Sequence, residues 1–199
     1  MDYTLFYAPH TGSDIALGVL RASGAPHKLV RLSYELTRKG QEPRLKKVNP
    51  LSRLPTLVLP NGQVLTESGA ILLHLHAAYP KAGLAPKAGT PDYDRFLRIL
   101  FILTGEIYPC FTFVDDPSEW VSAKSARRPY ALAIGKHRKE LWKYVESLLA
   151  PRGPWALGKK WSGLDLYLAQ MTSWRPGPEW FAKSTPRIAA IRRRSQPSS

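Results

Sequence analysis

Hydroxyl and imidazole side chains gather directly after the first apolar segment of the chain, as Tyr7, His10, Thr11 and Ser13. Ser13 stands at the start of a helical pattern, so its hydroxyl, the N–H groups of the first turn and the helix dipole can face one anion. His10 can stabilise an anion as an imidazolium or take a proton as a neutral base. This segment is the first candidate for chemistry, although Ser13 equally suits a plain helix cap.

A second polar pair, Glu67 and Ser68, stands where a short strand pattern gives way to a helical one. The N–H groups and the dipole at such a helix start attract a carboxylate, and the Ser68 hydroxyl adds a donor. The Glu67 carboxylate can pair with an ammonium group. Taken alone this pair is more often a helix cap, but its spacing after Pro55 favours a ligand-binding role.

The elements that position these residues alternate between strand and helix over the first 80 residues. Strands are expected at 3–7, 28–32, 54–59 and 64–66, helices at 13–23 and 68–79, and weak helical character at 35–47. The tight turn at 60–63 joins the last two strands into a hairpin. The order β-α-β-α-β-β-α predicts an α/β domain over residues 1–80.

Beyond residue 80 the apolar residues recur at helical spacing only. Residues 81–90 are expected to form a linker, and residues 91–199 an all-helical domain. Two apolar runs carry the spacing: Phe96, Ile99, Leu100, Leu103 and Ile107, then Leu141, Trp142, Val145, Leu148 and Leu149. Ser162 and Asp165 have the spacing of a capping box ahead of another apolar helix.

The net charge of +14 raises the expectation of an anionic partner such as nucleic acid. The basic residues are scattered, however, and only short runs such as Arg192-Arg193-Arg194 concentrate them. This distribution argues against a nucleic-acid partner, although the net charge is compatible with one. His74 and His76 lie two apart on a helix and point to different sides, which argues against a metal site.

Composition also bears on the compartment. Apolar stretches such as Ile99–Leu103 are too short to cross a bilayer, and the N-terminus lacks a secretory pattern. The single cysteine, Cys110, excludes an intrachain disulfide framework and fits a reducing compartment. We therefore expect a cytoplasmic protein with no membrane span.

Three segments resemble motifs of the cytosolic glutathione transferase family, in the family's order. Residues 49–57 resemble its Asn-Pro-x-Gly-x-Val-Pro-x-Leu segment, residues 65–71 its Leu-x-Glu-Ser-x-Ala-Ile segment, and residues 162–165 its C-domain capping box. The N-terminal half is most similar to the bacterial beta-class pattern, with Gly12 at the cysteine position. The resemblance implies a thioredoxin-like N-terminal domain, an all-α C-terminal domain, a homodimer, and glutathione as co-substrate.

The resemblance also implies how the tripeptide binds. The Leu54-Pro55 bond is expected to be cis, with the Leu54 backbone pairing with the cysteinyl backbone as an added strand. Glu67 and Ser68 are expected to hold the γ-glutamyl end. The base that binds the glycine carboxylate in the beta class is replaced by Thr37, so Arg38 or Arg53 is the expected substitute; a solvated surface role suits each equally well.

The family's reaction needs the glutathione thiol, with a pKa of about 8.5 when free, as a thiolate. Gly12 removes covalent or mixed-disulfide chemistry through the beta-class cysteine. Ser13 is the first candidate for activating the thiol and His10 the second, with Thr11 and Tyr7 as further donors; Tyr7 lies in an aromatic strand where packing is the commoner role.

In the C-terminal half the resemblance places Tyr108 beside glutathione and the second substrate. An apolar site for that second substrate could be lined by the aromatic residues Phe111, Phe113, Trp120, Trp174 and Trp180. Packing in the core also explains most of these aromatic residues. The expected activity is conjugation or reduction of small electrophiles in detoxification, including peroxidase-type side activity. The alternatives are a non-catalytic binding or regulatory protein, which Gly12 favours, and an anion-binding scaffold that uses the +14 charge.

Overall fold

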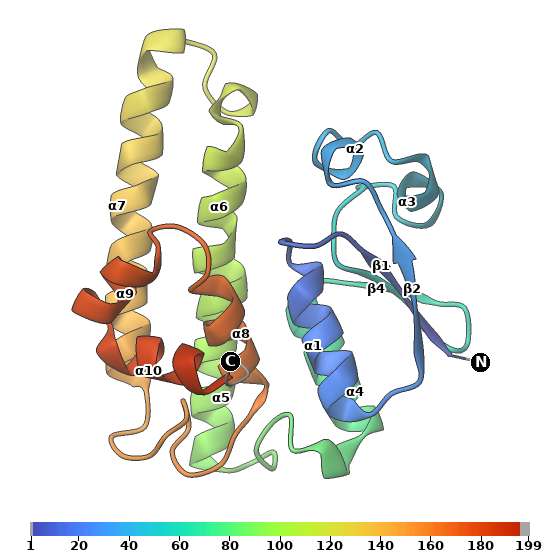
Figure 1. Ribbon diagram of the computed structural model, residues 1–199, viewed down its shortest axis with the longest axis vertical. Helices are drawn as coiled ribbons and strands as arrows, with labels where there is room; N and C mark the ends of the chain where they lie inside the picture. The colour runs from blue at the N-terminus through green and yellow to red at the C-terminus, as the bar shows by residue number, and fades with distance from the viewer. Residues whose placement is uncertain (1, 196–199) are drawn as a thin grey trace. The chain divides into compact units, whose positions relative to one another are not determined.

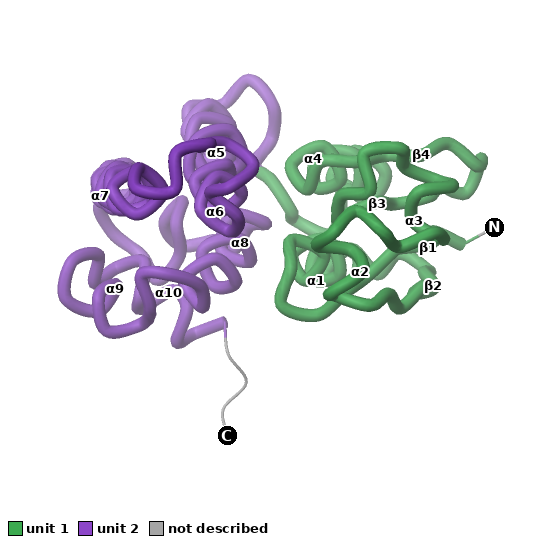
Figure 2. The backbone as a smooth tube through the Cα atoms, turned by 90° about the horizontal axis from the view of Figure 1, so that it is seen from above, with its two compact units in different colours: residues 1–85 green, residues 86–199 purple. Residues whose placement is uncertain are grey.

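The computed structural model describes residues 2–195 and divides into two compact units, residues 1–85 and 86–199 (Figure 2). Unit 1 is a four-stranded mixed sheet with helices, and unit 2 is helical (Figure 1). The fold class expected from the sequence, an α/β thioredoxin-like part followed by an all-helical part, is therefore confirmed.

The sheet of unit 1 has the strand order β2-β1-β3-β4. Its strands are β1 (Tyr3–Tyr7), β2 (His27–Arg31), β3 (Thr56–Val58) and β4 (Val64–Thr66). β1 pairs with β2 in parallel and with β3 antiparallel, and β3 and β4 form the expected antiparallel hairpin. This order brings the chain leaving β1 and the chain entering β3 to neighbouring positions in the sheet.

Helices α1 (Ser13–Ser23) and α4 (Ser68–Ala78) pack against each other in the core of unit 1. Their apolar residues, including Ile15, Val19, Ile71 and Leu75, are fully buried. Gly24, with φ of 70°, ends α1 in the left-handed conformation that glycine adopts without steric cost. The short turn η1 (Pro80–Ala82) follows α4.

The basic stretch with weak helical character forms two short helices, α2 (Tyr34–Arg38) and α3 (Pro43–Val48). Gly40, with φ of 64°, lies between them. Leu45 of α3 is fully buried and forms an apolar cluster with Phe6 and Leu32, against which Leu54 packs. The segment leading into β3 is thus anchored by an apolar side chain.

Unit 2 consists of α5 (Pro91–Ile102), the π-helical turn η2 (Leu103–Ile107), α6 (Tyr108–Asp115), the turn η3 (Pro117–Glu119), α7 (Lys124–Leu148), α8 (Gly163–Met171), α9 (Pro178–Ser184) and α10 (Pro186–Ser195). The predicted capping box is present at the start of α8: Asp165 Oδ2 accepts from the Ser162 N–H at 2.8 Å and Oδ1 from the Ala156 N–H at 2.8 Å. Both helical apolar runs of the sequence contribute to the core, through residues such as Phe96, Ile99, Trp142 and Val145.

By length and composition alone, the continuous helical stretch 91–115 could cross a membrane, with a mean hydropathy of 1.5 over its most apolar window. Four of its apolar residues, Phe96, Ile99, Leu100 and Leu103, are fully buried within the protein. The core helix of a soluble protein passes the same test, so this stretch is weak support for a membrane span.

Candidate functional site

The segment before β3 presents an unpaired piece of backbone at Leu54. The Leu54-Pro55 peptide bond is cis, as the family resemblance implied. Asn49 holds the preceding residue, because its Nδ2 donates to the Arg53 carbonyl at 3.1 Å and to Thr56 Oγ1 at 3.0 Å. Within residues 2–195 neither the N–H nor the C=O of Leu54 has a hydrogen-bond partner. Such a backbone can pair with an extended peptide as if with an added strand.

The start of α4 is a second unpaired group of donors. Only the fourth N–H, that of Ile71, bonds back, to the Glu67 carbonyl at 3.0 Å. In the described part of the chain the N–H groups of Ser68, Gly69 and Ala70 have no partner, as expected for a first helical turn. Glu67 is exposed and its carboxylate forms no ion pair with a described residue. A group of N–H donors that can bind a carboxylate therefore lies beside the unpaired carboxylate of Glu67.

Backbone strain is concentrated in the same loops. Three non-glycine residues of the described chain have positive φ: His10 at 63°, Ser52 at 52° and Glu67 at 63°. Each lies in a loop that carries predicted site residues. Residues held in this region of φ/ψ space are uncommon and cluster at ligand-binding and catalytic positions.

The Ser13 hydroxyl is turned into its own loop. Ser13 is fully buried, its Oγ donates to the Ala8 carbonyl at 2.9 Å, and the Ala8 N–H donates to the same Oγ at 3.1 Å. Thr11 Oγ1 lies 2.7 Å from Ser13 Oγ and also donates to the Ala8 carbonyl, at 2.7 Å. Both hydroxyl groups thus hold the turn that leads into α1. This geometry accounts for Ser13 without a ligand.

Tyr7 and His10 are both tied to Asp14 of α1. The Tyr7 hydroxyl donates to Asp14 Oδ1 at 2.9 Å, and the His10 backbone N–H donates to Oδ2 at 2.8 Å. Burial, followed by the bond to Asp14, raises the pKa of Tyr7 above its ordinary value. The His10 side chain is exposed, and no hydrogen bond joins its ring to another described residue. Of the four predicted thiol-activating side chains, the imidazole of His10 is the one not engaged in the loop.

The candidates for the glycine carboxylate differ in their surroundings. Arg38 is exposed and lies 3.8 Å from Glu35 in an i,i+3 pair. Thr37, which replaces the beta-class base, donates its hydroxyl to the Ser33 carbonyl at 2.7 Å. Arg53 is exposed, directly precedes Leu54, and forms no ion pair within the described residues. Arg53 is thus the cation that adjoins the unpaired backbone.

In unit 2 the predicted aromatic set separates into distinct groups. Tyr108 and Phe111 of α6 both meet Trp174 edge-to-face, with centroid distances of 5.6 and 5.2 Å. Phe113 instead pairs with Trp120, and Trp180 with the buried Phe181. Cys110 is a buried thiol whose pKa is raised by burial.

Sequence reasoning missed the buried arginine of unit 2, Arg138. Its guanidinium carbon lies 4.4 Å from the ring centroid of Phe111. The available signal was position: Arg138 precedes Trp142 by four residues and Val145 by seven, and so belongs to the apolar stripe of α7 that the sequence does show.

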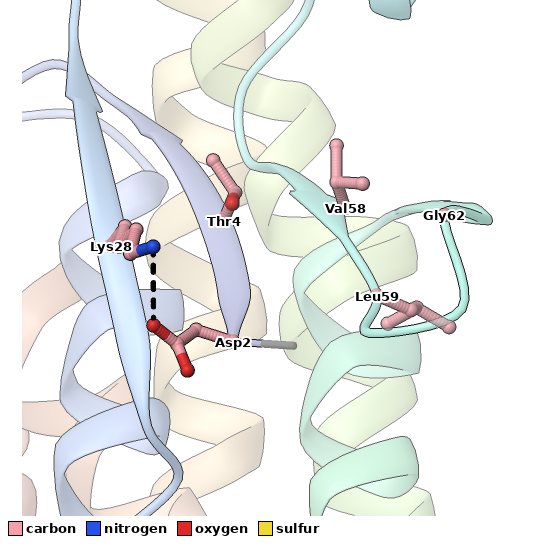
Figure 3. Close-up of a pocket in the computed structure, with 6 residues that line it drawn as sticks. All are labelled: Asp2, Thr4, Lys28, Val58, Leu59 and Gly62. Atoms are coloured by element: carbon pink, nitrogen blue, oxygen red, sulfur yellow. Dashed lines mark ion pairs between the residues drawn. The ribbon is translucent and has the colours of Figure 1, made fainter.

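A hollow of about 330 Å³ lies on unit 1, lined by Asp2, Thr4, Lys28, Val58, Leu59 and Gly62 (Figure 3). An ion pair of 3.4 Å between Lys28 and Asp2 lies in its wall. None of the predicted site residues lines it. Across residues 2–195 there is no group of three or more His, Cys, Asp or Glu side chains that could hold a metal ion.

The mixed sheet with its unpaired backbone at the cis-proline segment, followed by a helical unit, defines a thioredoxin-like protein with an α-helical C-terminal domain. Residues 13–78 match the family model described as glutathione S-transferase, N-terminal domain. The Escherichia coli (strain K12) protein YncG, an uncharacterised GST-like protein, is 34% identical over 187 residues, which cover 94% of this chain and 89% of YncG.

Two solved structures extend the comparison over both units. A glutathione transferase from Methylococcus capsulatus str. Bath is 30% identical with a TM-score of 0.76, covering 98% of this chain and 93% of that one. A sphingomonad glutathione S-transferase complexed with glutathione is 27% identical with a TM-score of 0.76, covering 98% and 94%. The chain belongs to the glutathione S-transferase family.

Proposed function

We propose that this protein is a glutathione transferase that binds glutathione on unit 1 and activates its thiol for attack on small electrophiles. The observation that carries the proposal is the unpaired backbone of Leu54 together with the unpaired first N–H groups of α4 beside Glu67. The family membership and the glutathione bound to the sphingomonad relative support glutathione as the ligand.

Each part of the tripeptide has a chemical counterpart. The cysteinyl backbone pairs with the Leu54 N–H and C=O. The γ-glutamyl carboxylate accepts from the Ser68 hydroxyl and the first N–H groups of α4, where the helix dipole favours an anion. The α-ammonium pairs with the Glu67 carboxylate, and the glycine carboxylate with Arg53 or Arg38. A peptide with charged groups at both ends satisfies all four of these counterparts.

The thiol is activated at the start of α1. The Ser13 hydroxyl serves the loop, so we now place His10 first: its exposed imidazole can take the thiol proton or stabilise the thiolate. The backbone N–H groups of Thr11 and Gly12, which lack partners within residues 2–195, add donors for the anion. In the conjugation step the sulfur bonds to an electrophilic carbon, whose leaving group departs with the bonding electron pair, and the thiol proton passes to His10 or to solvent.

A second candidate function is glutathione binding without turnover. It is favoured by Gly12, which offers no nucleophile where the beta class has cysteine. The two functions share the binding site and differ only in what the loop from His10 to Ser13 does to the sulfur.

One assay pair tests the proposal: retention on immobilised glutathione, and turnover of 1-chloro-2,4-dinitrobenzene with free glutathione. Retention with turnover supports the enzyme, retention without turnover the binder, and no retention contradicts both. In Glu67→Gln the ammonium contact is lost, and we expect glutathione affinity to fall about tenfold or more. Glu119→Gln removes a like charge from an exposed turn of unit 2 and should retain wild-type affinity.

The resemblance to the family also leads us to propose a cytoplasmic homodimer that acts in detoxification. Large apolar side chains such as Leu51, 74% exposed, and Phe101, 59% exposed, offer surface that an interface could cover. Light scattering of the purified chain tests assembly: a mass of one chain at micromolar concentration would contradict the dimer.

A further inference from the structure

Arg138 occupies a core position on an otherwise apolar stripe. The buried residues of α7 are Arg138, Trp142 and Val145, which share one face of the helix. Arg138 is 5% exposed, so its charge has been taken out of water. A buried guanidinium is normally matched by a carboxylate, by carbonyl groups or by a bound anion.

No such match is found within the described residues. The Nε and Nη1 atoms of Arg138 are buried and have no hydrogen-bond partner, and its guanidinium forms no ion pair. The Phe111 ring, 4.4 Å away, offers a cation–π contact, which supplies no hydrogen-bond acceptor. Burial lowers the pKa of Arg138, in keeping with an incompletely compensated charge.

The charged and titratable groups that act on Arg138 come from two other elements. The buried Cys110 and the exposed Asp115 lie on α6, and the exposed Arg175 follows α8. Arg175 adds positive potential, which the negative charge of Asp115 opposes to a smaller extent, and the Cys110 thiol is occupied in a contact with the Glu106 carbonyl at 3.2 Å. The positive charge around the Arg138 guanidinium is therefore not fully compensated, and an added negative charge would be favourable there.

An aromatic surface adjoins the guanidinium. Phe111, which lies under Arg138, meets Trp174 edge-to-face, and Trp174 meets Tyr108 in the same way. These three rings are half-buried, so the cluster reaches the surface of unit 2. A planar apolar body can pack on such rings while a charged group attached to it meets the guanidinium.

We propose that Arg138 binds the carboxylate of an aromatic acid whose ring packs on Tyr108, Phe111 and Trp174, and that the electrophiles used by this protein are accordingly anionic. The second half of this inference rests on the proposed transferase function. The carboxylate accepts charge-assisted hydrogen bonds from the guanidinium, whose Nε and Nη1 groups have no partner among the described residues.

Binding is tested first without glutathione, so that its result does not depend on turnover. The probe is 3,5-dinitrobenzoate, which has no leaving group, and its neutral analogue is 3,5-dinitrobenzamide. Calorimetric titration of the full chain should show binding of the acid and at least about tenfold weaker binding of the amide. Equal affinity for the two, or no binding of the acid, would overturn the proposal, because the guanidinium would then not recognise a carboxylate.

Arg138→Met removes the charge while keeping a long apolar side chain, and we expect it to abolish the preference for the acid. Arg128→Met is the matched control, since Arg128 is exposed on the same helix. The control should bind the acid as the wild type does. Because replacing a buried unpaired charge by an apolar group removes its desolvation penalty, Arg138→Met should melt at or above the wild-type temperature. The melting temperature of the wild type should rise with added acid; a wild type that the acid does not stabilise counts against the site even if Arg138→Met fails to fold.

Turnover provides the second arm, with 4-chloro-3,5-dinitrobenzoate and the corresponding benzamide as electrophiles. The thiolate sulfur bonds to ring carbon 4, chloride leaves with the bonding electron pair, the thiol proton goes to solvent, and the carboxylate is unchanged. Arg138→Met should lower the acid-to-amide ratio of kcat/KM about tenfold relative to Arg128→Met. Binding of the acid without turnover of either electrophile would refute the transferase function and leave the site standing; turnover with an unchanged ratio would refute the site and leave the transferase.

Discussion

The Tyr7 hydroxyl donates a hydrogen bond to Asp14 Oδ1 at 2.9 Å, and Asp14 thereby joins the end of β1 to the first turn of α1. The same carboxylate accepts from the His10 N–H through Oδ2. Asp14 therefore fixes the shape of the loop that contains the candidate thiol-activating residues. The hydroxyl proton of Tyr7 is donated to Asp14 within that loop.

From this arrangement we expect Tyr7→Phe to keep kcat/KM within about threefold of wild type, because the phenolic proton is already donated to Asp14. The free energy of unfolding should fall by about 1 kcal/mol, the usual net value of one hydrogen bond. Turnover of 1-chloro-2,4-dinitrobenzene and urea denaturation measure the two quantities. A loss of activity of a hundredfold with unchanged stability would restore Tyr7 as the activating donor.

The raised pKa of Tyr7 adds a pH dependence at the alkaline end. The folded state holds the phenolic proton more tightly than the unfolded state, so its stabilising contribution is complete below the unfolded value of about 10. That contribution is lost as pH rises through the higher folded value. Urea midpoints measured upward from pH 9 should therefore fall less steeply in Tyr7→Phe than in wild type; parallel curves would contradict this assignment.

His10 and Ser13 should separate when each is replaced by alanine. His10→Ala should raise the thiol pKa of bound glutathione, followed by thiolate ultraviolet absorbance, and lower kcat/KM by about 10²-fold. Ser13→Ala leaves the buried Ala8 N–H without an acceptor and should cost about 1–3 kcal/mol of stability, with little change in the thiol pKa. The reverse pattern, a raised thiol pKa in Ser13→Ala alone, would return Ser13 to the head of the ranking.

Much of unit 1 was readable from the sequence because its elements are bounded by residues with few alternatives. Gly24 ended the first helix where predicted, and Pro60 to Gln63 set the hairpin. The stretch 35–47 was read as one weakly helical segment, whereas Gly40 with its positive φ divides it into two helices.

The candidate site was less readable, because spacing does not show where a hydroxyl points. Ser13 has the right residue type and position for an anion contact, yet its Oγ meets the Ala8 backbone, a partner five residues earlier. The burial of Arg138 was not predicted for a related reason. An arginine next to an apolar stripe is normally interpreted as a charged surface residue, and only the structure shows that this one is buried.

Ser52 offers a stabilising substitution. Its φ of 52° suits glycine, which the family segment has at this position, and its buried Oγ has no hydrogen-bond partner among the described residues. Ser52→Gly should raise the free energy of unfolding by about 1 kcal/mol, the strain and desolvation relieved being partly offset by the entropy of glycine in the unfolded chain.

Ser52→Ala serves as the control, since it removes the hydroxyl and keeps the positive φ. Its stability in urea should lie between those of the wild type and Ser52→Gly. Equal stability of Ser52→Gly and wild type would show that neither the strain nor the orphaned hydroxyl is costly. Loss of glutathione retention in both variants would instead assign the hydroxyl to the ligand.

Asp165 should be among the most sensitive positions of unit 2. Its carboxylate accepts from the buried N–H groups of Ala156 and Ser162, and both would be orphaned in Asp165→Ala. We expect a loss of about 2–5 kcal/mol in the free energy of unfolding. Asp92→Ala, which removes an exposed partner of Arg95, should change stability by less than about 1 kcal/mol. Similar losses in both variants by thermal denaturation would count against the capping box as a main support of α8.

Cys110 is the chain's one cysteine, it is 3% exposed, and its pKa is raised by burial. Because the thiolate is the form that reacts with alkylating reagents, we expect the native protein to react very slowly with maleimides and iodoacetamide at neutral pH. A cysteine placed in an exposed turn, for example in place of Asn61, would then be the single labelled site, without removal of Cys110. The chain is therefore a ready host for one fluorophore or spin label, with which the movements of either unit can be followed in solution.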